Sequence, residues 1–288
     1  MEPILARLRV GGMPVADYVD GGGLDPDLSP RPYLHPVRTL GGTPVTDALP
    51  ADHRWHLGVS VAIQDVDGWN FWGGPTYVRG EGYVARDDHG RVAHAGFTRH
   101  GDDGFTERLH WHTPRGEVLL AEHRTVRARP AGPGWELDLV TTLANATDRP
   151  LRLGSPATNG RPGAGYGGLF WRLPPAPDPH VYTPAAAGEN AVHDAVAPWL
   201  AWADPAAGRT LVFTGTDAAT RADPWFVRVS DYPGVGSQLA APDPVTIPAG
   251  GTLTRGLRTL LADGVLADGA VRAWADAQRP RGTSLPRS

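Results

Sequence analysis

The sequence has 288 residues, of which 41% are hydrophobic and 20% are charged. This composition supplies enough apolar material for a packed core and too little charge for a disordered chain. The formal net charge is −4, and no run of basic residues is present. A nucleic-acid-binding surface needs a basic face that displaces counterions from phosphates, so we expect no nucleic-acid partner.

Cysteine is absent, which excludes disulfides, a thiol nucleophile and a Cys-ligated metal. No stretch approaches the roughly 18 consecutive apolar residues that a membrane helix requires. The first residues also lack the basic region and apolar core of a secretory signal. We therefore expect a cytoplasmic protein that does not contact membranes.

Glycine and proline, with 37 and 29 residues, divide the chain into short segments in which apolar and polar side chains alternate. Such alternation predicts strands. In residues 135–143 the apolar side chains lie mainly on one face, which predicts a strand with one face toward the core and one toward water. Edge strands and loops are expected at 1–30, and clear strands at 117–129, 135–143, 210–214 and 253–261.

The C-terminal part of the chain predicts one helix, at residues 269–278, because its residues favour helix and Val271 and Trp274 lie three apart. Residues 279–288 are expected to form a frayed tail. No fixed-period repeat and no interdomain linker is evident. The expected fold is all-β, a large antiparallel two-sheet β-sandwich forming a single domain over 1–288, with a short C-terminal helix.

The densest group of histidines and aromatic residues lies between residues 31 and 74. Histidine exchanges protons or binds metals near neutral pH, and tryptophan faces suit the apolar C–H surfaces of sugars. For any one of these residues, core packing or loop capping explains its presence as well as a ligand-binding role does, but the group as a whole indicates a ligand site. Its members are His35, His53, His56, Trp55, Trp69 and Trp72.

A second candidate is the predicted strand at 105–112, in which His110 and His112 point to the same face. Two imidazoles at this spacing can ligate a divalent metal if a third ligand and an open position complete the site. The alternative is that both face solvent beside a hairpin closed by residues 114–116. The candidates for a third ligand are Glu122, His123 and the His53/His56 pair.

A third candidate is the glycine-rich segment 160–168, which contains Tyr166 and enters an aromatic strand that ends in Trp171 and Arg172. Glycine allows the backbone to approach a ligand closely. Arginine can form paired hydrogen bonds with a carboxylate or with vicinal oxygens. The segment therefore indicates a binding loop followed by an anchoring guanidinium.

A fourth candidate is the segment 223–232, in which alternation puts Trp225 on one face and Arg228 on the other. Trp225 could stack on a ligand ring, and Arg228 could bind a ligand oxygen. The alternative is a surface ion pair between Arg228 and Asp231. No nucleophile elbow, dinucleotide fingerprint or zinc-protease helix occurs anywhere in the sequence, so no cofactor is expected, although a divalent metal stays open.

The order of these segments resembles a bacterial family of unknown function that is labelled "methane oxygenase PmoA", over about residues 31–264. The resemblance implies a galactose-mutarotase-type β-supersandwich that acts in sugar metabolism beside sugar oxidoreductases. The methane monooxygenase subunit of that name is a helical membrane protein, whose architecture a chain without a membrane span does not share. We therefore do not carry the oxygenase activity over.

The resemblance implies matched positions without assigning them a catalytic role. A typical family segment reads His-Pro-His-His-Arg-Gly, whereas this chain has Trp55 in place of a central histidine and Leu57 in place of the arginine. The family's proton or metal site is therefore incomplete here. The matched positions are His35, His53, His56, Trp72, Tyr166, Trp171 and Arg172.

Our leading hypothesis is a carbohydrate-active enzyme that binds a sugar or oxidised sugar on the concave sheet and transfers protons, as an epimerase, isomerase or lyase. His53, His56 or His110 would be acid and base, and Arg172 would hold a carbonyl or carboxylate oxygen. The expected substrate-binding residues are His35, Trp72, Tyr166, Trp171, Trp225 and Arg228.

Two other classes of protein stay open. A non-catalytic glycan- or metabolite-binding module would need the tryptophans but no paired histidines. A metal-dependent enzyme of secondary metabolism would use His110 and His112 as ligands. The expected partner is a small-molecule carbohydrate, and a homodimer joined through sheet edges stays open.

Overall fold

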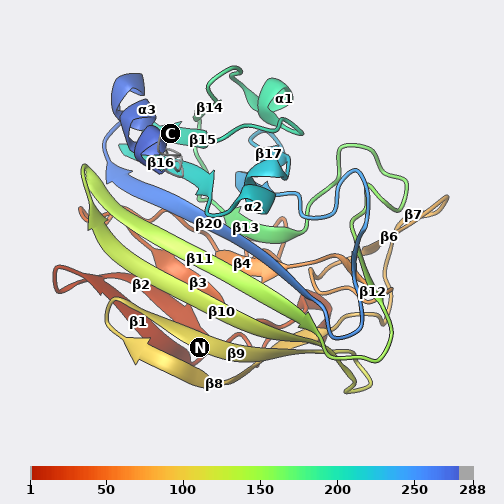
Figure 1. Ribbon diagram of the computed structural model, residues 1–288. Helices are drawn as coiled ribbons and strands as arrows, with labels where there is room; N and C mark the ends of the chain where they lie inside the picture. Colours follow the sequence, from red (N-terminus) through yellow and green to blue (C-terminus); the bar gives the residue numbers. More distant parts are fainter. Residues whose placement is uncertain (1, 279–288) are drawn as a thin grey trace, which may run out of the picture.

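Two antiparallel sheets face each other in the computed structural model, which describes residues 2–278 (Figure 1). The seven-stranded sheet has the order β1 (Ile4–Val10), β2 (Met13–Val19), β3 (Tyr33–Val37), β4 (Val59–Ala62), β13 (Gly168–Arg172), β18 (Gly234–Ser237) and β17 (Trp225–Arg228). The eight-stranded sheet has the order β14 (His180–Tyr182), β15 (Leu200–Asp204), β16 (Arg209–Gly215), β20 (Thr252–Asp263), β11 (Gly134–Asn145), β10 (Val118–Ala131), β9 (Gly104–His112) and β8 (Arg91–Gly101).

Smaller elements flank the two sheets. The hairpin of β6 (Thr76–Val78) and β7 (Gly82–Val84) projects beyond them in Figure 1. A three-stranded sheet joins β19 (Val245–Ile247), β12 (Leu151–Gly154) and β5 (Asp65–Val66). The helical segments are a 3-10 turn at Pro26–Leu28, α1 (Glu189–Val192), α2 (Ala218–Ala222) and α3 (Asp268–Ala277). None of the helices within 2–278 is long and apolar enough to cross a membrane.

The expected all-β sandwich is confirmed, and its main core lies between the two sheets. Strand alternation sends one set of side chains inward from each sheet. Leu34 and Val61 from the seven-stranded sheet belong to the same buried cluster as Trp111, Leu137 and Leu261 from the eight-stranded sheet. Burial of such side chains stabilises the fold by roughly 25 cal/mol per Å² of apolar surface.

The predicted strands and the C-terminal helix are confirmed within a few residues. The segments expected at 117–129, 135–143, 210–214 and 253–261 form β10, β11, β16 and β20, and the helix expected at 269–278 forms α3. Val271 and Trp274 of α3 pack against Trp199 and Leu260 on the outer face of the eight-stranded sheet. The tail expected at 279–288 lies outside the described residues.

The outer face of β11 is less exposed to water than its alternation predicts. Glu136 and Asp138 are buried there, because the indole nitrogen of Trp274 donates to Glu136 at 2.6 Å and Arg258 donates to Asp138 at 2.7 Å. Alternation correctly assigned the two faces of the strand. It could not predict that a terminal helix and an arginine would cover the polar face.

A polar network lies inside the sandwich, where the sheets approach at β2, β9 and β10. Arg124 donates to both carboxylate oxygens of Glu122, at 2.8 and 3.0 Å, and to the Tyr18 hydroxyl at 2.8 Å. Tyr18 in turn donates to Glu107. Buried charges are tolerated when they are paired in this way, so Arg124 is the group on which the network depends.

Replacing Arg124 by methionine should therefore destabilise the protein by about 3–5 kcal/mol, because two buried carboxylates lose their cation. Urea unfolding followed by circular dichroism measures this change. The control is Arg127→Met on the same strand, where the side chain is exposed and the expected change stays within about 0.5 kcal/mol. Equal stability of the two variants would contradict the assigned role of Arg124.

Candidate functional site

The outer face of the seven-stranded sheet carries a group of aromatic and charged side chains. In β13, Leu169 and Trp171 point into the main core, so alternation sends Phe170 and Arg172 to the opposite face. Phe226 of β17 points outward in the same way and joins Phe170 in a separate buried cluster. These residues form the floor on which the surrounding loops pack.

The loop that carries the paired histidines is bound to this floor through its backbone. Arg172 N–H donates to the Gly58 carbonyl at 2.8 Å, and Asp47 N–H donates to the Arg172 carbonyl at 3.0 Å. Gly58 has a φ of +44°, and a Cβ atom there would lie 2.1 Å from the Leu34 carbonyl oxygen. Only glycine fits this position, which explains the glycine that ends the His53–Gly58 motif.

A fully buried arginine joins the loops behind the site. The guanidinium of Arg31 donates to the carbonyls of Trp55 and Trp72 at 2.9 and 3.0 Å, and also to those of Leu28 and Ser29. No carboxylate pairs with it within residues 2–278. Burial, and then repulsion from Arg124, lowers the pKa of Arg31 to about 9.

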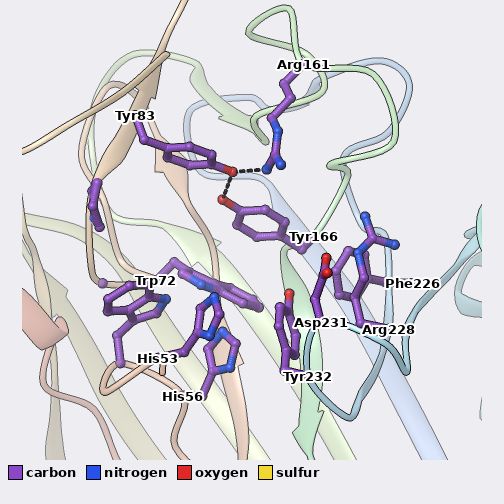
Figure 2. A pocket seen from close by; sticks show the side chains of 13 residues that line it. His53, His56, Trp72, Tyr83, Arg161, Tyr166, Phe226, Arg228, Asp231 and Tyr232 are labelled. Carbon is purple, nitrogen blue, oxygen red and sulfur yellow. Dashed lines mark hydrogen bonds between the residues drawn. The ribbon is translucent and has the colours of Figure 1, made fainter. Parts of the chain in front are cut away.

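These loops enclose a cavity of about 560 Å³ above the outer face of the seven-stranded sheet (Figure 2). The sequence hypothesis put the ligand on a concave sheet face, whereas this cavity has walls made of loops and of the β6–β7 hairpin. Its aromatic lining consists of Trp55, Trp72, Tyr83, Tyr166, Phe226 and Tyr232. Its ionisable lining consists of His53, His56, Arg161, Arg228 and Asp231, beside the tyrosines.

The two histidine rings of the cavity are stacked. The ring centroids of His53 and His56 lie 4.7 Å apart with an interplanar angle of 12°, and Tyr232 packs against both. His56 is only 1% exposed. Burial, followed by the nearby charges of His53 and Arg172, holds the pKa of His56 well below its usual value. His56 is therefore a neutral imidazole near neutral pH.

An aspartate and an arginine fix the two rings from behind. Arg172, 3% exposed, donates through Nη2 to both oxygens of Asp52 at 3.1 Å. Burial opposes ionisation of Asp52, but hydrogen bonds from His53 and Arg172 outweigh it and lower the pKa of Asp52. Asp52 is thus a carboxylate, and it accepts a hydrogen bond from His53 Nδ1 at 3.0 Å.

These contacts assign opposite tautomers to the two imidazoles. Arginine has no acceptor, so His56 Nδ1, 3.4 Å from Arg172 Nη1, must accept, and the proton of His56 lies on Nε2. His53 donates from Nδ1 to Asp52, so in its neutral form the lone pair of His53 lies on Nε2. No hydrogen bond joins either Nε2 atom to another residue in the described part of the chain.

A chain of phenols closes the opposite end of the cavity. The hydroxyls of Tyr166 and Tyr83 lie 2.9 Å apart, and Arg161 donates to Tyr83 with its guanidinium over the Tyr83 ring. Burial, with the neighbouring Tyr83, raises the pKa of Tyr166 well above its usual value. Figure 2 shows these groups at one end and the two histidines at the other.

The structure brings several of the predicted site residues together. Five of them line the cavity, and Arg172 lies behind it in contact with Asp52 and His56. We expected Arg172 to hold a substrate oxygen, whereas its Nη atoms are engaged by protein groups. The predicted residues that line the cavity are His53, His56, Trp72, Tyr166 and Arg228.

Three predicted substrate-binding residues do not line the cavity. Trp171 and Trp225 pack in the main core, because alternation puts them on the inner faces of β13 and β17, and their outward neighbours Arg172 and Phe226 face the site. His35 Nδ1 lies 3.0 Å from the Thr46 hydroxyl. Burial, the largest influence, lowers the pKa of His35.

The predicted histidine pair on β9 is separate from the cavity. His110 is exposed, and the rings of His110 and His112 lie 6.0 Å apart on the outer face of the eight-stranded sheet. Glu122, a candidate third ligand, is buried and bound by Arg124. No group of three or more His, Asp or Glu residues within 2–278 is arranged to hold a metal ion.

Sequence reasoning missed several residues of the cavity. Arg161, Phe226 and Tyr232 belong to segments that the sequence singled out, but other members of those segments were chosen as ligand-binding residues. Trp55 was included in the group of histidines and tryptophans without a role of its own. Tyr83 comes from the β6–β7 hairpin, which no motif indicated. The signal that identifies Phe226 is its alternation with Trp225, since the two must face opposite sides.

Comparison with solved structures defines the class of fold. A protein of Escherichia coli K12 that is provisionally described as an aldose 1-epimerase is similar over 91% of this chain and 100% of its own, with a TM-score of 0.52 and 11% identity. A galactose mutarotase-like protein of Lactobacillus casei covers 85% of this chain and 96% of its own, with a TM-score of 0.45 and 10% identity. The protein shares the β-sandwich fold of the Escherichia coli protein.

The sequence matches a family profile described as a family of unknown function, DUF6807, over residues 6–276. The protein therefore belongs to this family. The profile does not carry the methane-oxygenase label that the sequence resemblance suggested, and that label is unsupported. A search among curated proteins finds no match.

One glycine of the β6–β7 region is expected to fix the position of Trp55. A Cβ atom on Gly74, at φ +68°, would lie 2.6 Å from ring atoms of Trp55, whereas one on Gly80, at φ +84°, would meet nothing within 4 Å. Both alanine variants should lose about 1–2 kcal/mol from the left-handed backbone. Only Gly74→Ala should also change the near-ultraviolet circular dichroism, because Trp55 must move. Identical spectra for the two variants would contradict this packing.

The lowered pKa of His56 predicts a pH-dependent contribution to stability. The unfolded chain protonates this histidine below about pH 6.5, but the folded protein resists protonation, so stability present above pH 6.5 is lost as the pH falls toward the folded pKa. We expect the free energy of unfolding, measured with urea, to depend less on pH in His56→Gln than in the wild type. Between pH 7 and 5 its slope should be smaller by up to about 1.4 kcal/mol per pH unit. The control is His110→Gln, at an exposed site, which should keep the wild-type slope. If His56→Gln also keeps the wild-type slope, the assignment is disproved.

Proposed function

We propose that this protein is a carbohydrate-active enzyme that binds a sugar or oxidised sugar in the cavity and transfers protons on it, as an epimerase, isomerase or lyase. The observation that carries the proposal is the stacked pair His53 and His56, held in opposite tautomers by Asp52 and Arg172. One imidazole offers a lone pair, and the other offers an N–H. Acid/base catalysis on a sugar requires both at once.

The aromatic walls favour a sugar over other small molecules. Trp55 is partly exposed beside the histidines, and Trp72 and Phe226 add apolar surface. Sugar rings offer C–H faces to such side chains and hydroxyls to the polar groups between them. A volume of about 560 Å³ lies within the usual range of small-molecule sites, roughly 300–1,000 Å³.

The fold is consistent with this class of ligand. The Escherichia coli protein with the similar sandwich is provisionally described as an aldose 1-epimerase. At 11% identity that likeness concerns the fold alone. The proposal for this chain therefore depends on its own cavity residues.

In the proposed reaction His53 Nε2 removes a proton from a carbon or hydroxyl of the sugar. His56 donates its Nε2 proton to the oxygen on which negative charge develops. Return of the two protons, to the other face of the carbon or to a neighbouring atom, completes an epimerisation or isomerisation. Asp52 and Arg172 act through the histidines as positioning residues, since their polar groups contact the rings and each other.

The test is proton nuclear magnetic resonance in deuterium oxide with a panel of aldoses, uronates and keto-sugars. The wild-type protein should exchange a sugar C–H for deuterium or form a new isomer or unsaturated product. His53→Phe and His56→Phe keep a stacked ring and should each slow the reaction by about 10²–10⁴-fold, while His112→Phe, outside the cavity, should not. Sugar binding with no reaction, unchanged in both histidine variants, would instead establish the non-catalytic binding module.

Asp52→Asn separates positioning from simple packing. The amide keeps the shape of the carboxylate. Because an amide can donate as well as accept a hydrogen bond, it no longer requires His53 Nδ1 to carry the proton. We expect kcat to fall with little change in KM, and the pH profile of the reaction to shift. An equal rise in KM with kcat intact would point to a role in binding alone.

A further inference from the structure

The cavity contains two arginines that no carboxylate neutralises in the described residues. Arg228 donates to the carbonyls of Val227 and Gly163, both at 2.8 Å, and its guanidinium lies 4.7 Å from the centre of the Phe226 ring. The Arg161 guanidinium donates to the Tyr83 hydroxyl and lies over the Tyr83 ring. Neutral carbonyls, a hydroxyl and rings satisfy part of each fork, and neither guanidinium forms an ion pair within residues 2–278.

A third positive charge lies behind the wall. Arg31 is 0% exposed and bonds directly to the backbone of Trp55 and Trp72, two lining residues. Its partners are carbonyl oxygens and a hydroxyl. A buried charge without a counterion acts on its surroundings over a longer range than an exposed one, because the protein interior screens it weakly.

Negative charge at the cavity is smaller. Asp231 lines it and is exposed, so that it partly offsets the arginines. Asp52 is engaged by Arg172 and His53, and His56 is neutral. The formal net charge of the whole chain is −4, so the positive charge of the arginines in this cavity is opposite in sign to the net charge of the chain.

Arg161 belongs to the loop that contains Gly163, and the guanidinium of Arg228 is bound to the same loop. Arg228 Nη2 bonds to the carbonyl of Gly163, two residues beyond Arg161. Figure 2 shows Arg161 at the end of the cavity opposite His53 and His56, and Arg228 at one side beside Phe226. An anionic group held by the arginines would therefore leave the rest of a sugar extending toward the imidazoles.

We propose that the substrate is an acidic sugar, whose carboxylate binds Arg161 and Arg228 while its reacting carbon lies at His53 and His56. This inference rests on the proposed function and names its substrate class. A carboxylate matches the planar arginine fork through paired hydrogen bonds. The carboxylate then supplies negative charge that balances the positive charge of Arg161, Arg228 and Arg31.

The experiment is isothermal titration calorimetry with matched pairs, D-glucuronate against D-glucose and D-galacturonate against D-galactose. At least one acidic sugar should bind about tenfold or more tightly than its neutral partner, and the preference should shrink as sodium chloride is raised. Arg161→Met and Arg228→Met should each remove about tenfold of affinity for the acidic sugar and little for the neutral one. Arg115→Met is the control, since Arg115 lies over Trp69 outside the cavity.

Lysine variants keep the test valid if methionine impairs folding. Arg161→Lys and Arg228→Lys retain the charge without the fork and should give intermediate affinity. Equal binding of acidic and neutral sugars, or an unchanged preference in the arginine variants, overturns the acidic-sugar inference and leaves the proposed function intact. Inorganic phosphate that binds as tightly as the uronates also overturns it. Failure of every sugar to bind overturns both proposals.

Discussion

The guanidinium of Arg31 donates hydrogen bonds to backbone carbonyls from two separate loops, those of Trp55 and Trp72, at the back of the cavity. Removal of this one side chain would leave several buried carbonyls without donors, each costing about 1–3 kcal/mol. Within residues 2–278 no backbone–backbone hydrogen bond joins the Trp55 loop directly to the Trp72 loop. Their relative position, and with it the position of the histidines over β13, therefore depends on a cation buried where cations are unfavourable.

The second constraint is the alternation of side chains along β13 and β17. The same kind of alternation elsewhere in the chain allowed strands of the facing sheets to be predicted from the sequence, since period and turn residues are local properties. It also decides which residues belong to the site. Trp171 and Trp225 were predicted to bind substrate, yet their register sends them into the core and brings Arg172 and Phe226 to the cavity side.

The remaining parts of the site depend on contacts between distant segments. Arg161 bonds to Tyr83, 78 positions earlier, and Arg172 bonds to Asp52, 120 positions earlier. Neither pairing leaves a periodic signal in the sequence. The histidine segment could be singled out because its unusual residues are adjacent, whereas the tautomers of His53 could only be inferred once its partner was known.

Because the cavity lies on the outer face, β13 divides its residues between two separate tasks. Leu169 and Trp171 pack in the core, whereas Phe170 and Arg172 serve the site. The outer residues and the loops can therefore change the lining of the cavity while the inner residues keep the core packed, without any rebuilding of the sandwich.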